Sequence, residues 1–168
     1  MKKLLFLTTC YLLCCHWGMA QKGEVMVGGQ LVYSSDLKTA GLGVIAEFNL
    51  TEKLNVSPGF SFYFPKTHTF IKQSAWELNG NANYYFIKQE GIEFYGLGGI
   101  NYTSVSSKSD LSGFGFGEVK ATVGRVGLNL GAGGNFDLGK QILPFGEIKY
   151  IVSEFDRLVV AAGVKFKF

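Results

Sequence analysis

The side chains that could do acid–base, nucleophilic or metal chemistry are few in this sequence. All three cysteines lie within the first 15 residues, and His68 is the one histidine after residue 20. Thr67, Thr69 and Ser74 place hydroxyl groups near His68 in the chain, but no carboxylate lies close to it. A catalytic histidine works with such a partner, and one imidazole without thiolates cannot build the usual zinc site. We therefore predict no catalytic residue and no metal site, and we interpret His68 as a solvated loop residue.

One glycine-rich segment matches a dinucleotide-binding fingerprint in spacing only. Gly41, Gly43 and Ala46 follow the pattern G-x-G-x-x-A. In a nucleotide-binding fold this pattern opens a helix, whereas here the chain continues as an alternating strand to Phe48. The formal charge of +3 provides no basic stripe for nucleic acid. We predict no cofactor and no nucleic-acid partner.

Residues 1–20 have the pattern of a cleaved secretory signal peptide. Two lysines are followed by a mostly apolar stretch, and Gly18-Met19-Ala20 offers small residues at the positions that a signal peptidase reads. An uncleaved membrane anchor, or a lipoprotein acylated at Cys14 or Cys15, are the alternatives. Cleavage would leave one domain, residues 21–168, without cysteines and with a formal charge of +3 minus 2, or +1.

The composition is unusual for a domain surrounded by water. The 168-residue chain is 47% hydrophobic and only 17% charged, whereas charged residues make up about 25% of an ordinary soluble domain. After residue 20 there is nevertheless no apolar run of about 18 residues, the length that a membrane-spanning helix needs. The apolar side chains must therefore be placed on another kind of element.

Apolar and polar residues alternate along most of the chain. Between Trp76 and Phe86 the even positions are apolar or small, and the odd positions up to Asn83 are polar. A period of two is typical of strands with two unlike faces. The pattern predicts eight strands, at residues 24–34, 40–49, 54–64, 74–86, 92–104, 121–136, 142–152 and 158–168. The fold class is therefore all-β.

The connections between these strands alternate in character. The longer or more polar ones are residues 35–39, 65–73, 105–120 and 153–157, and the tight ones are residues 50–53, 87–91 and 137–141. Tight turns at one end and longer loops at the other are typical of an antiparallel up-and-down transmembrane β-barrel whose long loops lie outside the cell. Eight strands enclose an interior that side chains fill, so we predict no open pore.

Aromatic residues favour a barrel with its apolar face toward lipid. They occur near both ends of the strands, as the two interfacial girdles of a membrane barrel do. The predicted girdle residues are Tyr33, Phe62, Trp76, Tyr102 and Tyr150 near the longer loops, and Phe48, Phe86, Phe94, Phe136 and Phe168 near the tight turns. A soluble lipocalin-like barrel, with the apolar face inside, is the alternative.

The opposite face of the strands carries glycines and a balanced set of charges. Four acidic residues, Glu47, Glu77, Glu93 and Glu147, match four basic ones, Arg125, Lys149, Lys165 and Lys167. Unpaired ions inside a narrow barrel would be costly, so opposite charges are expected to occur together there. We predict that these residues are the charges of the barrel interior.

The C-terminal strand has a recognisable pattern. Val164, Phe166 and the terminal Phe168 alternate with polar residues, which resembles the signal by which outer-membrane barrels are recognised by their assembly machinery. With the alternating loops and the strand around Pro144 to Tyr150, the chain resembles the small eight-stranded outer-membrane barrels of the OmpX and OmpA-barrel type. The resemblance implies a monomeric porin-like barrel in the outer membrane of a Gram-negative-type bacterium, in contact with membrane lipid and with the assembly machinery.

The connection over residues 105–120 suggests a role at the cell surface. It is rich in serine and glycine but presents Phe114 and Phe116, which could contact a surface ligand; alternatively, they extend the hairpin and pack on each other. The predicted function is a non-enzymatic envelope protein that binds through its outer loops. A lipocalin-like binder of apolar ligands, and a lipid A-modifying barrel enzyme that uses His68, are the alternatives.

Overall fold

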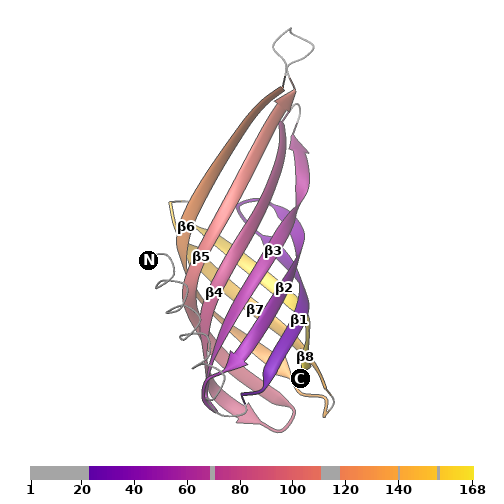
Figure 1. The fold of residues 1–168 in the computed structure, drawn as a ribbon, viewed down its shortest axis with the longest axis vertical. Coiled ribbons are helices and arrows are strands. Elements are labelled where there is room, and N and C mark those ends of the chain that lie inside the picture. The colour runs from indigo at the N-terminus through magenta and orange to yellow at the C-terminus, as the bar shows by residue number, and fades with distance from the viewer. Residues whose placement is uncertain (1–22, 69–70, 111–117, 140, 155) are drawn as a thin grey trace, which may run out of the picture.

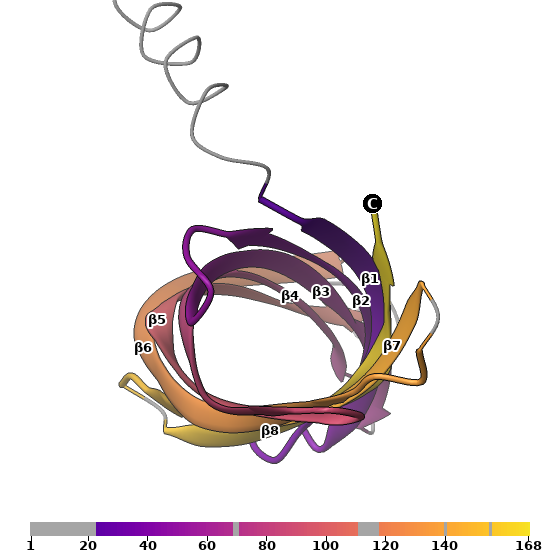
Figure 2. The ribbon, with the colours of Figure 1, turned by 90° about the horizontal axis from the view of Figure 1, so that it is seen from below.

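The computed structural model describes residues 23–68, 71–110, 118–139, 141–154 and 156–168, and these form a closed barrel. Its strands are β1 (Val25–Ser34), β2 (Thr39–Asn49), β3 (Leu54–His68), β4 (Ile71–Gln89), β5 (Ile92–Asp110), β6 (Glu118–Phe136), β7 (Ile142–Val152) and β8 (Arg157–Lys167). Each strand pairs antiparallel with its neighbour in the chain, and β1 also pairs with β8 (Figure 1, Figure 2). The prediction of an eight-stranded antiparallel up-and-down barrel is confirmed.

Closure of the barrel is visible in the register of β1. Leu31 of β1 lies opposite Leu42 of β2 on one side and opposite Ala162 of β8 on the other. Backbone groups on both sides of β1 therefore have partners, as a sheet in lipid requires. The described part of the chain contains no helix that is long and apolar enough to cross a membrane.

The two ends of the barrel differ. We call the end with the β2–β3, β4–β5 and β6–β7 turns the turn end, and the opposite end the loop end; Phe168 lies at the turn end (Figure 1). Two of the three turns contain a glycine with a left-handed backbone, Gly91 (φ 87°) and Gly139 (φ 69°). Such a backbone is costly for residues with a Cβ, so glycine keeps these turns tight.

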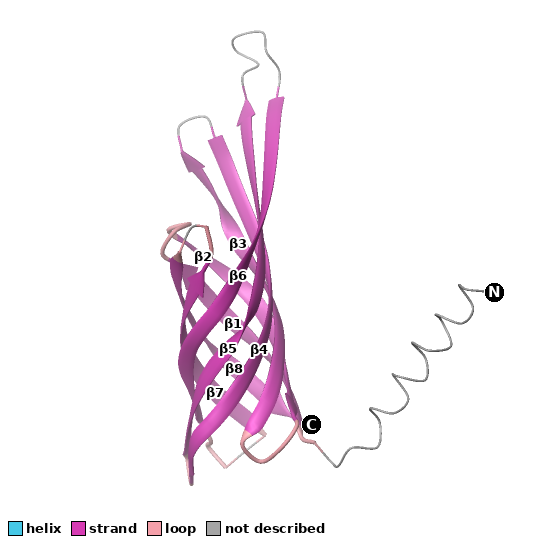
Figure 3. Cartoon of the chain, turned by 90° about the vertical axis from the view of Figure 1, so that its left-hand side faces the viewer, coloured by secondary structure: helices cyan, strands magenta, loops and turns pink. Residues whose placement is uncertain are grey.

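Four strands project beyond the others at the loop end (Figure 3). Strand β3 has 15 residues, and β4, β5 and β6 have 19 each, whereas the other strands have 10 or 11. The strands predicted to end or begin at residues 64, 74, 104 and 121 are therefore longer than predicted, because the chain continues as strand where the sequence suggested loop. Pairing between β6 and β7 stops at Leu128, so the rest of β6 extends past β7. We call the loop-end part of β3–β6, past the level of Trp76 in β4, the projecting sheet.

Small residues and one irregularity shape the interior. A Cβ on Gly99 would lie 2.2 Å from the Gly80 carbonyl oxygen, and one on Gly133 would lie 2.4 Å from the Tyr95 ring. Larger side chains would not fit at these positions without movement. Tyr85 of β4 points into the barrel in phase with Asn81 and Asn83, and a register shift just after it leaves both Phe86 and Ile87 exposed.

Candidate functional site: the lipid-facing belt and the ionic interior

The outer surface of the barrel is apolar. Ile100 and Val126, halfway along their strands, are 64% and 71% exposed. Every predicted girdle residue is on this outer face, with Trp76 partly covered by Phe60 and Tyr102: Tyr33, Phe48, Phe62, Phe86, Phe94, Tyr102, Phe136, Tyr150 and Phe168 are exposed. A continuous apolar belt of this size is unfavourable in water and marks a surface that meets lipid or a partner. This polarity contradicts the lipocalin-like alternative, which needs the apolar face inside.

The interior toward the loop end is organised around one carboxylate. Glu77 is fully buried and contacts Lys149 Nζ at 3.5 Å and Arg157 Nη2 at 3.3 Å. Asn79 donates a hydrogen bond to Glu77 at 3.0 Å, and Arg157 also donates to Asn101 at 3.1 Å. A buried carboxylate between two cations and an amide has the charge compensation that a low-dielectric interior requires. We call these five residues the upper cluster.

Asparagines connect the neighbouring strands β4, β5 and β6 inside the barrel. Asn129 of β6 donates to Asn79 of β4 at 3.0 Å and to Asn81 at 2.7 Å, while Asn101 of β5 donates to Asn79 at 2.9 Å. Each amide can both donate and accept, so asparagine satisfies its neighbours without adding charge. One side of the interior is therefore lined by linked amide side chains.

A second ionic group lies toward the turn end. Lys165 contacts Glu47 at 2.5 Å and donates to Asn135 at 3.0 Å. Glu47 also accepts hydrogen bonds from Asn55 and from the Tyr85 hydroxyl, both at 3.2 Å. Glu47 and Lys165 are fully buried. We call these five residues the lower cluster.

The structure places the predicted interior charges as follows. Glu47, Glu77, Glu147, Lys149 and Lys165 are buried, and Glu93 and Arg125 are partly buried on the same face. Glu147 accepts a hydrogen bond from Tyr95 at 3.3 Å, and Glu93 accepts one from Asn135 at 3.0 Å. Sequence reasoning assigned each of these charges to the interior but could not pair them, because the pairs join strands that are far apart in the sequence.

Arg157 is an interior charge that the sequence pattern does not identify. The pattern predicts that it lies in the connection 153–157, but it is the first residue of β8 and is 3% exposed. Its odd number places it in phase with Lys165, since residues two apart share a face of a strand. That phase was the available signal, and the acidic residues just before Arg157 concealed it by resembling a loop.

Lys167 lies at the rim of the turn end. Its ammonium contacts the Asp137 carboxylate at 2.9 Å, and the Gly139 backbone N–H donates to the same carboxylate at 2.8 Å. The hydrogen bond from Lys167, followed by that from Gly139, holds the pKa of Asp137 below its ordinary value. This pair ties the β6–β7 turn to the end of β8.

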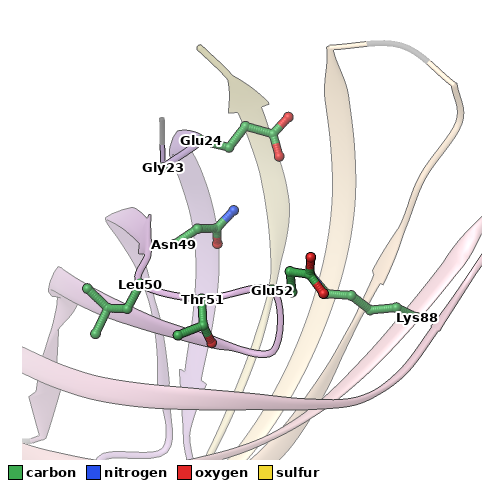
Figure 4. A pocket seen from close by; sticks show the side chains of 7 residues that line it. All are labelled: Gly23, Glu24, Asn49, Leu50, Thr51, Glu52 and Lys88. Atoms are coloured by element: carbon green, nitrogen blue, oxygen red, sulfur yellow. The ribbon is translucent and has the colours of Figure 1, made fainter. Parts of the chain in front are cut away.

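A cleft of about 570 Å³ opens at the turn end (Figure 4). Its lining comes from the start of β1, the β2–β3 turn and the end of β4: Gly23, Glu24, Asn49, Leu50, Thr51, Glu52 and Lys88. Asn49 accepts a hydrogen bond from Asn55 at 3.5 Å, and Asn55 belongs to the lower cluster. The cleft is thus joined to the charged interior through an asparagine pair.

Other predicted residues lie at the chain ends and loops. Phe166 pairs with Val27 and Ile142, and the Phe168 N–H donates to the Val25 carbonyl at 2.9 Å, so the C-terminal strand closes the barrel. The backbone of His68 ends β3 opposite Ile71. The predicted signal peptide, Phe114 and Phe116 lie outside the described residues. Among the residues that are described, no group of three or more His, Cys, Asp or Glu side chains could hold a metal ion.

Comparison with known proteins gives matches by structure. No protein-family model matches the chain, and no curated protein sequence matches it. The attachment invasion locus protein Ail of Yersinia pestis superposes with a TM-score of 0.62 at 15% identity, over 87% of this chain and 97% of that one. The N-terminal β-barrel domain of Pseudomonas aeruginosa OprF gives a TM-score of 0.70 at 14% identity, over 88% of this chain and all of that one.

Neisserial surface protein A gives a TM-score of 0.64 at 16% identity, over 88% of this chain and 98% of that one. At such identities the likenesses concern the fold. The expected resemblance to small eight-stranded outer-membrane barrels is confirmed at that level.

Proposed function

We propose that this chain, which has the fold of the small eight-stranded outer-membrane β-barrels, is an integral protein of a bacterial outer membrane with no enzymatic activity. The observation that carries the proposal is its reversed polarity: exposed apolar side chains surround the barrel while ion pairs fill it. In water this arrangement would expose the belt and bury charge at the same time. In lipid both the exposed apolar belt and the buried charges are favourable, because acyl chains solvate the belt and the interior charges are paired.

The filled interior supports a closed barrel. The upper and lower clusters and the asparagines between them link side chains from β2 to β8 across the interior. A narrow eight-stranded barrel has room for such side chains and for little else. We infer that the protein acts as a membrane-embedded scaffold, as a monomer, and does not conduct solutes.

The projecting sheet is the part best placed to meet partners outside the cell. It extends the β3–β4 and β5–β6 hairpins past the apolar belt (Figure 3). Two of the structurally similar proteins are named an attachment invasion locus protein and a surface protein. We propose surface binding through this sheet and its loops, Phe114 and Phe116 included. Loss of cell adherence in F114S/F116S, with unchanged barrel migration on a gel, would support it; unchanged adherence would contradict it.

Insertion in the membrane is tested by fractionation and by migration on a denaturing gel with and without boiling. A closed lipid-embedded barrel stays folded in detergent until heated, so its apparent size is expected to shift on boiling and the protein to co-sediment with outer membranes. Recovery in the soluble fraction without a shift would contradict the proposal.

We further propose that Val164, Phe166 and Phe168 form the signal read by the barrel-assembly machinery. An F168A variant that accumulates outside the membrane, beside an F136A control that inserts normally, would support this.

A further inference from the structure

Two buried amide oxygens at the lower cluster have no hydrogen-bond partner among the described residues. They are the Oδ1 atoms of Asn55 and Asn83, and both side chains are fully buried. The two asparagines are directly opposite each other on β3 and β4. Buried polar groups in proteins nearly always have a partner. Two neighbouring acceptors without one therefore indicate a place for a donor or a cation.

The orientation of both amides is fixed by Glu47. The Asn55 amide nitrogen donates to the Glu47 carboxylate at 3.2 Å and to the Tyr85 hydroxyl at 3.1 Å. The Asn83 amide nitrogen donates to Glu47 at 3.5 Å and to the Ser57 hydroxyl at 3.0 Å. Turning either amide over would place its oxygen against the carboxylate, since an amide oxygen only accepts hydrogen bonds. Both oxygens therefore point away from Glu47 and are available to bind a positive group.

The interior charges balance over the whole barrel but not around the lower cluster. Besides Glu47, the carboxylates of Glu93 and Glu147 lie beside this cluster, hydrogen-bonded to an asparagine and a tyrosine that adjoin Lys165. Lys165 is the one lysine within the cluster. Lys149, two positions from Glu147 on β7, contacts the carboxylate of the upper cluster at 3.5 Å. An excess of carboxylates is unfavourable in a low-dielectric interior, and one more cation would reduce it.

A cation can approach these oxygens from the turn end. The cleft at that end is lined by two carboxylates, Glu24 and Glu52, and by one lysine, Lys88 (Figure 4). Asn49 also lines the cleft and accepts a hydrogen bond from Asn55 at 3.5 Å. A single side chain thus separates the cleft from the Asn55 amide.

The loop end provides a poorer route. Side chains from five strands form an apolar cluster there: Val32, Tyr63, Ala75, Ile151, Val159 and Ala161, with Leu37 and Val105 packed against it. The cluster adjoins the upper cluster, because Val159 is opposite Lys149 and Ile151 is opposite Arg157. An ion without its hydration shell is strongly disfavoured among apolar side chains. Entry from the turn end is therefore favoured.

We propose that the free amide oxygens of Asn55 and Asn83 bind an alkali-metal cation, sodium or potassium, that enters through the turn-end cleft. Carbonyl oxygens can replace the hydration shell of such an ion, as they do in potassium channels. A divalent ion takes several carboxylate ligands, but the Glu47 carboxylate already contacts Lys165. A buried water molecule would satisfy the oxygens without reducing the excess of negative charge.

The bound ion has a consequence for the barrel. It would link β3 to β4 beside Glu47 and make the stability of the interior depend on which small cation is present. The site would exist in detergent as it does in lipid, so its test is independent of the membrane location proposed above.

Binding is measured by equilibrium dialysis of radioactive sodium, and of rubidium as a substitute for potassium, against the full chain folded in zwitterionic detergent with choline as the background cation. The site variants are N55L and N83L. The matched control is N129L, because the Asn129 oxygen is also buried without a partner among the described residues, but its nitrogen donates to neutral oxygens. We expect the parent and N129L to bind one ion, and each site variant to bind about tenfold more weakly or less.

Two further measurements separate ion binding from a structural role. E147Q keeps the shape of the side chain and removes one charge beside the site, so it should bind sodium several-fold more weakly while still shifting on boiling. The urea midpoint of the parent and N129L should be higher in sodium or potassium chloride than in choline chloride at equal ionic strength, with no such difference in N55L and N83L. Simple destabilisation would lower the midpoint equally in all three salts.

Two results would overturn the proposal. One is a parent that binds neither ion and has the same urea midpoint in all three salts, which would indicate buried water at the amide oxygens. The other is an equal loss of binding in N129L and N83L, which would place the ion elsewhere in the interior.

Discussion

The barrel interior and the projecting sheet both carry charge, but they arrange it in opposite ways. Inside, Glu77 lies between Lys149 and Arg157, so each charge has a counter-charge from another strand. Outside, Lys72, Lys108 and Lys120 face one another with the same sign. The fold itself compensates these interior charges, because the side chains are buried away from the surrounding solvent. These three lysines are exposed, so water and ions can screen the repulsion between them.

Removal of the central interior carboxylate should have the largest effect. An E77A variant leaves Lys149 and Arg157 buried without their counter-charge, which should cost about 3–5 kcal/mol of unfolding free energy. The measurement is urea unfolding in lipid vesicles, followed by the gel shift. E52A, which removes an exposed carboxylate from the β2–β3 turn, is the matched control. If E77A were as stable as E52A, the interior ion pairs would not stabilise the barrel.

A lysine placed in the belt should come next. Leu130 of β6 is exposed and lies opposite Gly98, which is midway along β5 between the girdle residues Phe94 and Tyr102. A lysine at the centre of a lipid-facing strand costs about 2–4 kcal/mol, falling to about 0–1 kcal/mol near the interface. L130K should therefore destabilise the protein in vesicles far more than S74K, whose position is one outward step beyond Trp76 toward the loop end. Equal effects of the two substitutions would mean that Leu130 does not face the acyl chains.

The contrast between the two faces also applies to glycine. A methyl group at Gly99 would meet the Gly80 carbonyl oxygen and Asn81, whereas at Gly146 it would meet nothing within 4 Å. Overpacking of this kind costs about 1–3 kcal/mol, so G99A should unfold at lower urea than the parent and G146A should not. A reversed order would contradict the assignment of Gly99 to the packed interior.

A charge change at Lys120, on the projecting sheet, should have the smallest effect and the opposite sign. K120E places a carboxylate directly opposite Lys108, and an opposite-charge pair in that position stabilises a sheet by about 0.2–1 kcal/mol. In vesicles of uncharged lipid K120E should therefore unfold at slightly higher urea than the parent. A loss of stability there would show that Lys108 and Lys120 do not repel each other in the folded protein.

Alternation in the sequence predicts the barrel because lipid and the interior impose different polarities on alternate residues. The prediction works best where both environments act, as in β4 from Trp76 to Asn83. It fails in the projecting sheet, where outward residues such as Lys72, Ser106 and Thr122 are polar and the other face carries both polar and apolar residues. Water there imposes no period of two, so the strands extend past the predicted ends without a signal.

The interior network could be predicted in composition but not in geometry. Glu47 and Lys165 are each recognisable as polar residues on the inner face, yet they are 118 positions apart. Their contact depends on how far each strand is shifted against its neighbour and on how the barrel closes, and single-strand patterns contain neither quantity. The same holds for Tyr85, which is in phase with the inward asparagines of β4 but contacts Glu47 of β2, 38 positions away.

The central claim is that the apolar face of the strands meets lipid, and Trp76 tests it most directly. In the chain without residues 1–20, Trp76 is the one remaining tryptophan of two. It is partly exposed on the outer face, between Phe60 and Tyr102. The measurement is its fluorescence in vesicles whose lipids carry bromine at different depths. We predict quenching that is strongest for bromine near the headgroups and weak quenching by aqueous iodide. Strong quenching by iodide with none by brominated lipid at any depth would contradict the account.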